Sequence, residues 1–283
     1  MTEKVLYNKV TIGGVGLMGG SLGMALKKKG LAKEVVGWGR NESRLAAARE
    51  LGAIDRGTLD MGEALSGTDL LVFATPIGVT SRIAPEWFSA APPDCMITDM
   101  ISVKGTVVND LTGLAGPRRY YASSHPLCGS DETGVAAARA DLFEGRLCLI
   151  TTLPKTKKRA IGEVQNLWQA LGMRVLAMAP TRHDQVVAAV SHLPLLLASA
   201  LINQIGDEKL LRFSGTGLLD ATRIAGSSPA MWAEIITENK KSVLEEIERM
   251  LETLMLVKQH VKSGDPARIK VWLQQASRRR RKM

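Results

Sequence analysis

A glycine motif between a strand and a helix constrains this chain more than any other feature. The pattern Gly14-x-Gly16-x-x-Gly19 comes directly after the apolar run 9–13, and a helical pattern over 22–29 follows it. Gly14 permits a tight turn, Gly16 lets backbone amides approach a pyrophosphate, and Gly19 lets the helix pack closely on the strand. The helix N-terminus adds partial positive charge. The motif predicts a dinucleotide site, the alternative being a purely structural turn.

Strand and helix patterns alternate along the first two thirds of the chain. Apolar strand-like runs continue at 34–38, 70–74 and 96–99, with helical patterns such as 43–51 between them. This alternation predicts a parallel, doubly wound sheet with right-handed crossovers. Further strands are expected at 120–122, 147–150 and 174–176.

The pattern changes near Pro180. Beyond it we find only helical patterns, with long ones over 184–204 and 231–261. The predicted fold class is therefore α/β, with an N-terminal Rossmann-type doubly wound sheet over 1–180 and an all-α dimerisation domain over 181–283. Because a small helical domain with such apolar stripes buries them best against a second copy, we expect a homodimer.

Composition excludes several classes of protein. The net charge of +9 owes five charges to the run Arg278–Lys282, expected to be a frayed, solvated end, and only 4% of the residues are aromatic, so we expect no nucleic-acid partner. No apolar run was found to reach the roughly 18 residues of a membrane span, so no membrane partner is expected. Cys95, Cys128 and Cys148 form no C-x-x-C pair, which favours a cytoplasmic protein without disulfides or zinc.

The end of the second strand departs from the usual NAD fingerprint. Gly39 stands where an acidic residue normally accepts from the adenosine ribose, and Arg40 follows directly, with Arg44 one turn into the next helix. A cationic pocket without an acid favours a 2′-phosphate, so we expect NADP in preference to NAD. The alternatives are that Glu42 supplies the acid, or that the arginines are only solvated.

Two later strands end in residues that suit the edge of such a site. Ser102, in the segment after the fourth strand, could donate to a reacting hydroxyl or to the nicotinamide amide. Lys104 in the same segment could simply lie in a solvated helix start. Thr75 and Pro76 follow the third strand and are expected to touch the cofactor. The expected cofactor-binding residues are Gly14, Gly16, Leu17, Met18, Gly19, Arg40, Arg44, Thr75, Pro76 and Ser102.

A histidine stands in the Pro- and Gly-punctuated segment 123–134, which we expect to be a loop. Imidazole exchanges protons readily near neutral pH, so His125 is a candidate partner for a hydroxyl whose carbon gives up hydride. Taken alone, a histidine in a loop is more often structural than catalytic.

The helical part contains further candidates. His183 and His192 lie nine residues apart and do not share a helix face, so no metal site is expected. Asp184 as a helix cap and His192 as a packing residue are the structural interpretations. Arg223, in a break rich in Gly, Ser and Pro, suits bidentate capture of a carboxylate, and Trp232 would form a rigid wall beside it.

Together these segments resemble the prephenate and arogenate dehydrogenases of tyrosine biosynthesis. The resemblance runs from Val10 to about Leu254. Five motifs match in order, namely 14–22, 99–104, 125–134, 191–194 and 222–232.

The resemblance implies an oxidative decarboxylation of a cyclohexadienol with hydride transfer to NADP or NAD. It makes His125 the catalytic group on the ring hydroxyl and Ser102 the residue that orients both. Arg223 would bind a substrate carboxylate, and Trp232 would close the site from this or the other subunit. The expected substrate-binding residues are Arg223, His192, Trp232 and Asp131.

Two departures from the family pattern concern the substrate. Leu195 follows Pro194 where many members have a histidine that would contact a carboxylate, which favours arogenate over prephenate. Asp131 stands where Glu is common, and it could contact the arogenate ammonium or hold Arg223. An NAD-dependent prephenate dehydrogenase, a related β-hydroxy-acid dehydrogenase and a non-catalytic dinucleotide-binding regulator remain the alternatives.

Overall fold

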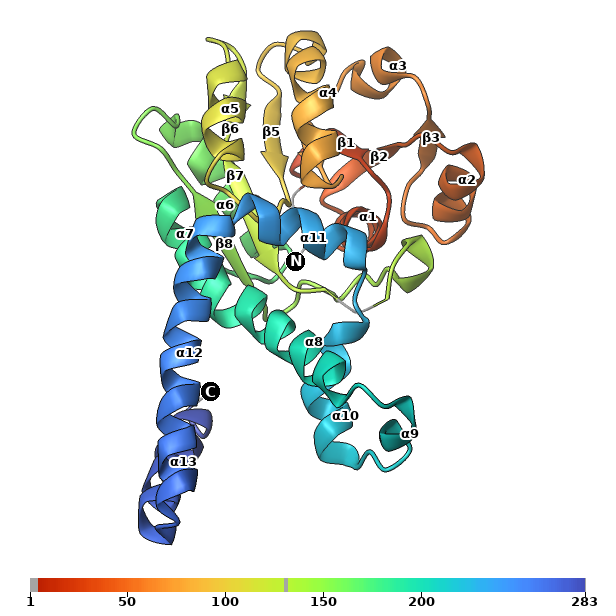
Figure 1. The fold of residues 1–283 in the computed structure, drawn as a ribbon. Coiled ribbons are helices and arrows are strands. Elements are labelled where there is room, and N and C mark those ends of the chain that lie inside the picture. Colours follow the sequence, from red (N-terminus) through yellow and green to blue (C-terminus); the bar gives the residue numbers. More distant parts are fainter. Residues whose placement is uncertain (1–4, 130–131, 283) are drawn as a thin grey trace.

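The computed structural model describes residues 5–129 and 132–282, and its first part is a parallel sheet with helices on both faces (Figure 1). The strand order is β3-β2-β1-β4-β5-β6, and every neighbouring pair is parallel. Buried apolar residues on both faces explain why these strands read as continuous apolar runs. The expected Rossmann-type sheet is confirmed. Its strands are β1 (Tyr7–Gly13), β2 (Ala32–Trp38), β3 (Arg56–Thr58), β4 (Leu70–Phe73), β5 (Met96–Asp99) and β6 (Tyr120–Tyr121).

The helices of this sheet begin in two different ways. The side chains of Asn41 and Asp60 accept from backbone amides and cap α2 and α3. Gly16 begins α1 without any side-chain cap, which leaves the first amides of that helix available to an anion. These helices are α1 (Leu17–Lys28), α2 (Glu42–Glu50), α3 (Met61–Leu65), α4 (Ile77–Ala90) and α5 (Val107–Leu114).

A second, three-stranded sheet follows, which the sequence pattern did not separate from the first. It contains β7 (Ser123–Leu127), β8 (Leu147–Thr151) and β9 (Arg174–Met178), with β7 antiparallel to β8 and β9 parallel to it. The turn η1 (Val135–Ala137) precedes β8, and α6 (Lys158–Ala170) joins β8 to β9.

This second sheet corrects the expectation that His125 lies on a loop. His125 stands within β7, opposite Leu149 of β8. Pro126 is tolerated in the strand because β7 is an edge strand, where a missing N–H need not break a ladder. The ladder therefore holds the imidazole on a rigid element.

The described part of the chain beyond Pro180 is entirely helical, as expected. One long helix was predicted over 231–261, and this was wrong, because α11 ends and α12 begins at Asn239. The basic tail was expected to fray, but Arg278–Arg280 form the last turn of α13, where cations favour the helix dipole. The elements are α7 (Pro180–Val187), η2 (Ala188–His192), α8 (Leu193–Ile205), α9 (Glu208–Leu211), α10 (Thr216–Thr222), η3 (Arg223–Gly226), α11 (Pro229–Glu238), α12 (Lys240–Ser263) and α13 (Pro266–Arg280).

The stretch Pro180–Ile205 corrects the statement that no run reaches membrane-spanning length. By length and composition this helical stretch could cross a membrane. In its most apolar 18-residue segment, one third of the residues are buried in the protein. Its polar positions include Ser191 and His192, which interrupt the apolar run without charge. The π-helical turn η2 lies in this stretch, just before Pro194, which has no N–H to donate to the α-helical ladder.

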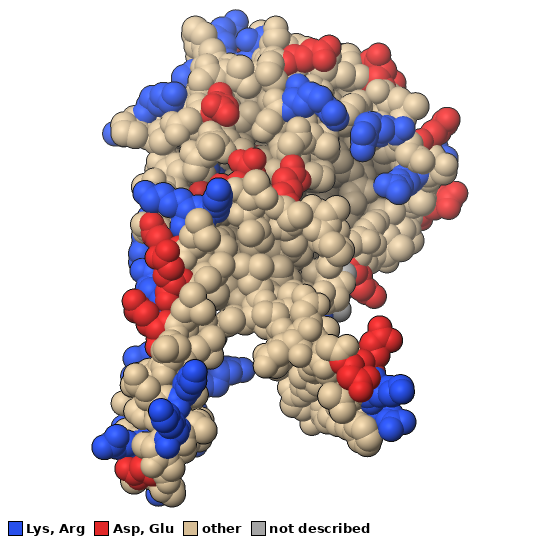
Figure 2. All heavy atoms as spheres, in the orientation of Figure 1, with Lys and Arg blue, Asp and Glu red and all other residues tan. Residues whose placement is uncertain are grey.

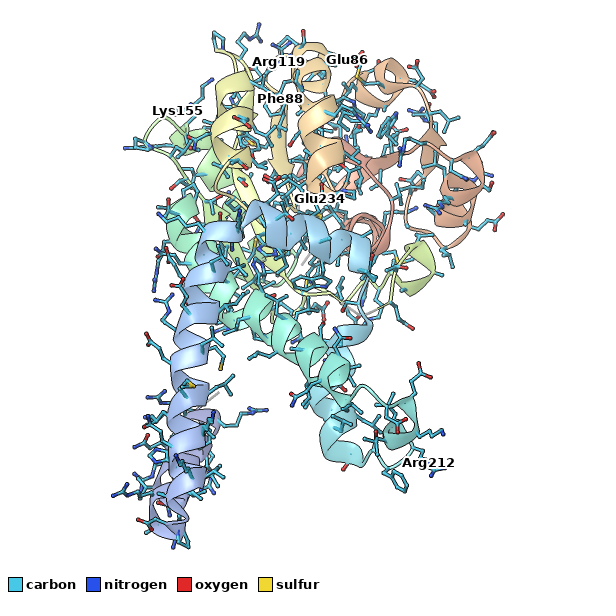
Figure 3. All side chains as sticks on the ribbon, in the orientation of Figure 1. Glu86, Phe88, Arg119, Lys155, Arg212 and Glu234 are labelled. Atoms are coloured by element: carbon cyan, nitrogen blue, oxygen red, sulfur yellow. The ribbon has the colours of Figure 1, made fainter. Side chains whose placement is uncertain are left out.

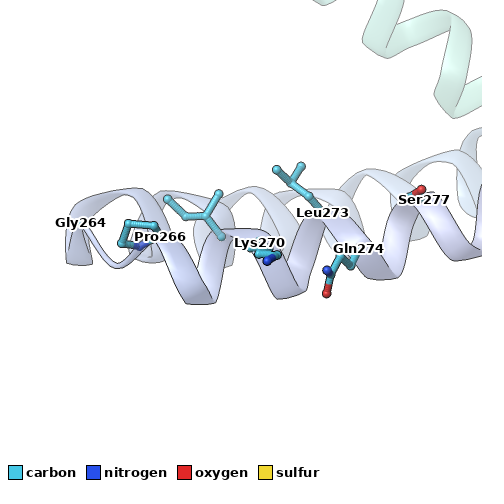
Figure 4. Close-up of a pocket in the computed structure, with 7 residues that line it drawn as sticks. Gly264, Pro266, Lys270, Leu273, Gln274 and Ser277 are labelled. Atoms are coloured by element: carbon cyan, nitrogen blue, oxygen red, sulfur yellow. The ribbon is translucent and has the colours of Figure 1, made fainter.

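Two helical arms extend away from the sheets, one formed by α12 and α13 and the other by the end of α8 with α9 and α10 (Figure 1). Few charged side chains lie on the face between them (Figure 2). A shallow apolar hollow of about 570 Å³ runs along α13, where Leu273 is half exposed (Figure 4). Other exposed apolar side chains on the arms are Leu201, Leu210, Leu211, Phe213, Leu219, Leu244, Leu251, Leu254, Met255, Leu256, Val261 and Val271.

Helix α11 joins the two parts by lying across the carboxyl ends of the parallel strands (Figure 1). Its Ile235 is buried in the core cluster that also contains Phe73 and Ile77. Glu234 accepts a hydrogen bond from the backbone N–H of Gly78 in the first turn of α4 (Figure 3). The helical part thereby covers the edge at which open α/β sheets bind ligands.

Candidate active site

Two adjoining cavities lie at the carboxyl edge of the parallel sheet. The outer has a volume of about 910 Å³ and the inner about 340 Å³, and both are lined by Gly16, Thr75 and Pro76. They lie where β1 and β4 meet, the point at which the strand order of the sheet reverses. A long ligand could therefore extend from one cavity into the other.

The glycine motif shapes the shared part as the sequence predicted. Gly14 has a φ of +97°, which L-residues with a side chain rarely adopt. A Cβ on Gly19 would come within 2.0 Å of the Gly14 carbonyl oxygen, whereas a Cβ on Gly16 would meet nothing within 4 Å. Gly16 therefore faces open space beside the uncapped start of α1, which fits a pyrophosphate. Leu17 and Met18 line the inner cavity.

The outer cavity ends at the loop after β2. Arg40 and Arg44 both line it, beside Gly39, and its described lining residues include no carboxylate. The side chain of Asn41 accepts from the backbone amide of Arg44, which fixes the start of α2. Glu42 lines a separate hollow and is not among the residues that line the outer cavity.

The inner cavity lies between the two parts of the chain. Ser102 lines it from the segment after β5, as do Met100 and Ile101. Met231 and Glu234 line it from α11. The helical part therefore forms one wall of this cavity.

A buried polar network supports this end of the cavity, and it corrects the expectation for Lys104. Lys104 is fully buried rather than solvated, and its Nζ donates to Asp99 Oδ1 at 2.5 Å and to the Ser124 carbonyl at 2.7 Å. Tyr121 donates its hydroxyl to the other carboxylate oxygen of Asp99 at 2.7 Å. Burial lowers the pKa of Lys104, and Asp99 opposes that shift. The network fastens β7, and with it His125, to the segment that carries Ser102.

His125 is held by a second histidine. Its Nδ1 lies 2.9 Å from Nε2 of His183, and the two rings are tilted by 52°. Burial lowers the pKa of His125 well below its ordinary value, and the neighbouring His183 ring and the Lys104 ammonium lower it further. The imidazole is therefore neutral near pH 7 and able to accept a proton.

Sequence reasoning missed His183 as a site residue and misread Asp184. Asp184 lies inside α7, and its carboxylate accepts from the backbone amides of Lys104 and Gly105 instead of capping its own helix. It also accepts from Nδ1 of His183 at 2.8 Å. The adjacent His-Asp pair just after the last strand was the only signal in the sequence, and no local pattern indicated its partner 58 residues away.

Family models match both parts of the chain. Residues 22–177 match the nucleotide-binding domain of prephenate dehydrogenase, and residues 179–275 match its dimerization domain. The chain belongs to the prephenate dehydrogenase family. It is therefore an NAD(P)-dependent oxidoreductase, of a family that performs an oxidative decarboxylation in tyrosine biosynthesis.

Individual relatives are similar to this chain over nearly its whole length. The chain is 31% identical to prephenate dehydrogenase of Bacillus subtilis, over 92% of this chain and 72% of the relative. It is 30% identical to cyclohexadienyl dehydrogenase of Zymomonas mobilis, over 92% and 90%. The solved prephenate dehydrogenase of A. aeolicus, in complex with hydroxyphenyl propionate and NAD+, superposes with a TM-score of 0.90 at 32% identity, covering 97% of this chain and 98% of that one.

Four residues were predicted to bind the substrate, and the structure describes three of them. His192 is buried, with Asn239 Nδ2 3.2 Å from its Nδ1 and its ring edge against Trp232 at 5.8 Å. Burial lowers the pKa of His192 to about 4. Arg223 begins η3 and is exposed. Asp131 lies outside the described residues. The substrate roles of these four residues stay predictions.

Proposed function

We propose that this protein catalyses the oxidative decarboxylation of arogenate, in preference to prephenate, with hydride transfer to NADP. Hydride leaves the ring carbon that bears the hydroxyl, and the ring carboxylate leaves as carbon dioxide. Aromatisation supplies the driving force. The chain's own task is to orient the ring and to remove the hydroxyl proton.

The observation that carries this proposal is the hydrogen bond between His125 and His183. Because Nδ1 of His125 is committed to His183 at 2.9 Å, Nε2 is the nitrogen that can accept the proton of the ring hydroxyl. Ser102, which lines the inner cavity, would orient that hydroxyl. His125→Asn tests this assignment, as set out in the Discussion.

The preference for NADP rests on the outer cavity. A 2′-phosphate there would meet Arg40 and Arg44, and among the described lining residues no carboxylate would repel it. The nicotinamide of the bound cofactor supplies the hydride acceptor at the other end. The competing proposal is NAD, which the A. aeolicus relative contains in its solved complex.

The preference for arogenate rests on Leu195. This residue is buried on α8, directly after Pro194, and its side chain cannot hydrogen-bond a carboxylate. Arg223 would bind the side-chain carboxylate that both substrates have. The competing proposal is prephenate, the substrate in the names of several relatives.

Steady-state kinetics with both substrates and both cofactors decide between these proposals. We expect kcat/KM to be highest with NADP and at least as high with arogenate as with prephenate. Equal efficiency with NAD and NADP would contradict the assignment of Arg40 and Arg44. A large preference for prephenate would contradict the assignment of Leu195.

We also propose that the protein is a homodimer through the helical domain, residues 181–283. The half-exposed apolar side chains of α12 and α13, such as Leu251 and Leu254, would lose contact with water only against another chain. Removal of apolar surface from water favours such an assembly, against the entropy lost on association. Light scattering during size-exclusion chromatography should give twice the chain mass of 30.5 kDa, and a monomer at micromolar concentration would contradict the proposal.

A further inference from the structure

Three titratable side chains lie in a line that runs from β7 to α7, and none of them is among the residues that line the inner cavity. His125 on β7 contacts His183 on α7 at 2.9 Å, and His183 contacts Asp184 Oδ1 through its other ring nitrogen at 2.8 Å. His183 is fully buried and Asp184 is 6% exposed. The chain of contacts thus connects a half-buried imidazole to a carboxylate that lies deeper in the protein.

Backbone amides fix the far end of this line. Asp184 accepts from the N–H of Lys104 at 2.8 Å and from the N–H of Gly105 at 2.7 Å. Two amide donors stabilise the ionised form of a carboxylate, which can only accept hydrogen bonds. A Cβ on Gly105 would come within 2.8 Å of Asp184 Oδ2, so the close approach requires glycine there.

An ionised Asp184 determines the tautomer of both histidines. Because the carboxylate only accepts, Nδ1 of His183 must carry a proton, and in a neutral ring its Nε2 is then a bare acceptor. That nitrogen can accept only from Nδ1–H of His125. Neutral His125 is consequently left with a bare Nε2, which is the form that a general base requires.

The charges around the line favour placing an added proton on His183 rather than on His125. His125 lies near Lys104, whose ammonium is paired with Asp99, and near His192. Burial lowers the pKa of both His125 and His183, but at His183 the hydrogen bond and charge of Asp184 oppose the shift. A positive charge is better tolerated on His183 than on His125.

We propose that His183 and Asp184 form a proton relay behind His125 that sets its tautomer and takes up its charge. In the hydride-transfer step the hydroxyl O–H bond breaks as the ring C=O bond forms, while hydride passes to the oxidised nicotinamide. The hydroxyl proton goes to Nε2 of His125, and the proton on Nδ1 of His125 goes to Nε2 of His183. The positive charge then lies beside the Asp184 carboxylate. This inference rests on His125 being the base, as proposed above.

The main test is Asp184→Asn, which removes the charge in either orientation of the amide. If the amide nitrogen faces His183, it donates to Nδ1. The proton of neutral His183 then moves to Nε2, and that of neutral His125 moves to its own Nε2. We expect kcat to fall about 100- to 10,000-fold, as when the carboxylate behind a catalytic histidine is replaced by an amide. KM and the affinity for NADP should stay within a few-fold. The acid limb of the pH–kcat profile should move to lower pH, because a cation on the histidines loses its counter-charge.

The matched control is Asp110→Asn, the same change at an exposed position on α5.

A second variant and a spectroscopic measurement keep the test independent of folding. His183→Gln should lower kcat in the same range while NADP still binds. In the unmodified protein, nitrogen NMR of the imidazoles should show the proton of neutral His125 on Nδ1 and a bare Nε2. A proton on Nε2 of His125, or an Asp184→Asn enzyme within threefold of normal turnover, would overturn the relay. If His125→Asn itself kept its activity, the proposed base would be wrong, which is a different result.

Discussion

The outer and inner ends of the cavity handle charge in opposite ways. At the outer end, Arg40 and Arg44 are exposed residues on a loop and on the first turn of a helix. Next to the inner cavity, Lys104 directly follows the lining residue Val103, and Lys104 and His183 are both fully buried and hydrogen-bonded to groups on other elements. An exposed charge is screened and can be replaced without loss of the fold, whereas removal of one buried partner leaves the other uncompensated. Substitutions at the two ends should therefore differ in size and in kind.

The largest effect should come from the inner end. His125→Asn removes the proposed base and should lower kcat by about two to four decades. Because asparagine is small and polar, NADP should still bind with nearly normal affinity. Stopped-flow measurement of hydride transfer, with cofactor binding followed separately, checks both statements. Near-normal turnover would show that another group is the base.

At the outer end, Arg40→Ala should act on one cofactor only. The loss of a charged contact to the 2′-phosphate should raise KM for NADP by about one to two decades, or 1.5–3 kcal/mol, with little change for NAD. Arg49→Ala is the matched control, because Arg49 lies on α2, directly after the loop of Arg40, but lines a different hollow. An equal rise in KM for NADP and for NAD would show that Arg40 does not contact the 2′-phosphate.

The substrate preference offers a smaller, differential effect. Leu195→His should move the ratio of kcat/KM towards prephenate, by up to about tenfold for one added hydrogen bond. The ratio within one variant is the measured quantity, so lost stability affects both substrates alike. Leu195→Met keeps the volume and the apolar character and should leave the ratio unchanged. A shift equally large in Leu195→Met would show that packing alone sets the preference.

The last effect concerns stability against pH and not turnover. Burial lowers the pKa of His192 from 6.5 to about 4, and Asn239 Nδ2 lies beside its Nδ1. The unfolded chain therefore binds a proton between these values that the folded chain excludes. The free energy of unfolding should fall as the pH drops through this window, by at most ~1.4 kcal/mol per unit for this residue. Urea unfolding at pH 7 and pH 5 measures the slope, and His192→Gln should reduce it. An unchanged slope in that variant would contradict the shift.

The arrangement of the first sheet could be predicted because its signals are local. Apolar runs, helical periodicity and the glycine positions each depend on neighbours within a few residues, so the Rossmann-type sheet and the lining by Gly16, Arg40 and Ser102 followed from the pattern. Strands were also predicted at 147–150 and 174–176, where β8 and β9 lie, but β7 and the separation into a second sheet were missed, because the antiparallel pairing of β7 with β8 is a long-range choice. The proline of β7 gave the appearance of a loop, although an edge strand accepts one.

By itself the sequence determined which residue types stand at each strand end and which helices carry apolar faces. It determined the dinucleotide motif, the family and the candidate base. Only the tertiary structure decided that Lys104 is buried on Asp99, that His183 supports His125, and that Asp184 binds amides of another segment. These contacts join residues far apart in the chain, and the strength of each contact depends on how deeply its partners are buried. Burial in turn arises only when β7, α7 and the segment after β5 pack together, which no local pattern encodes.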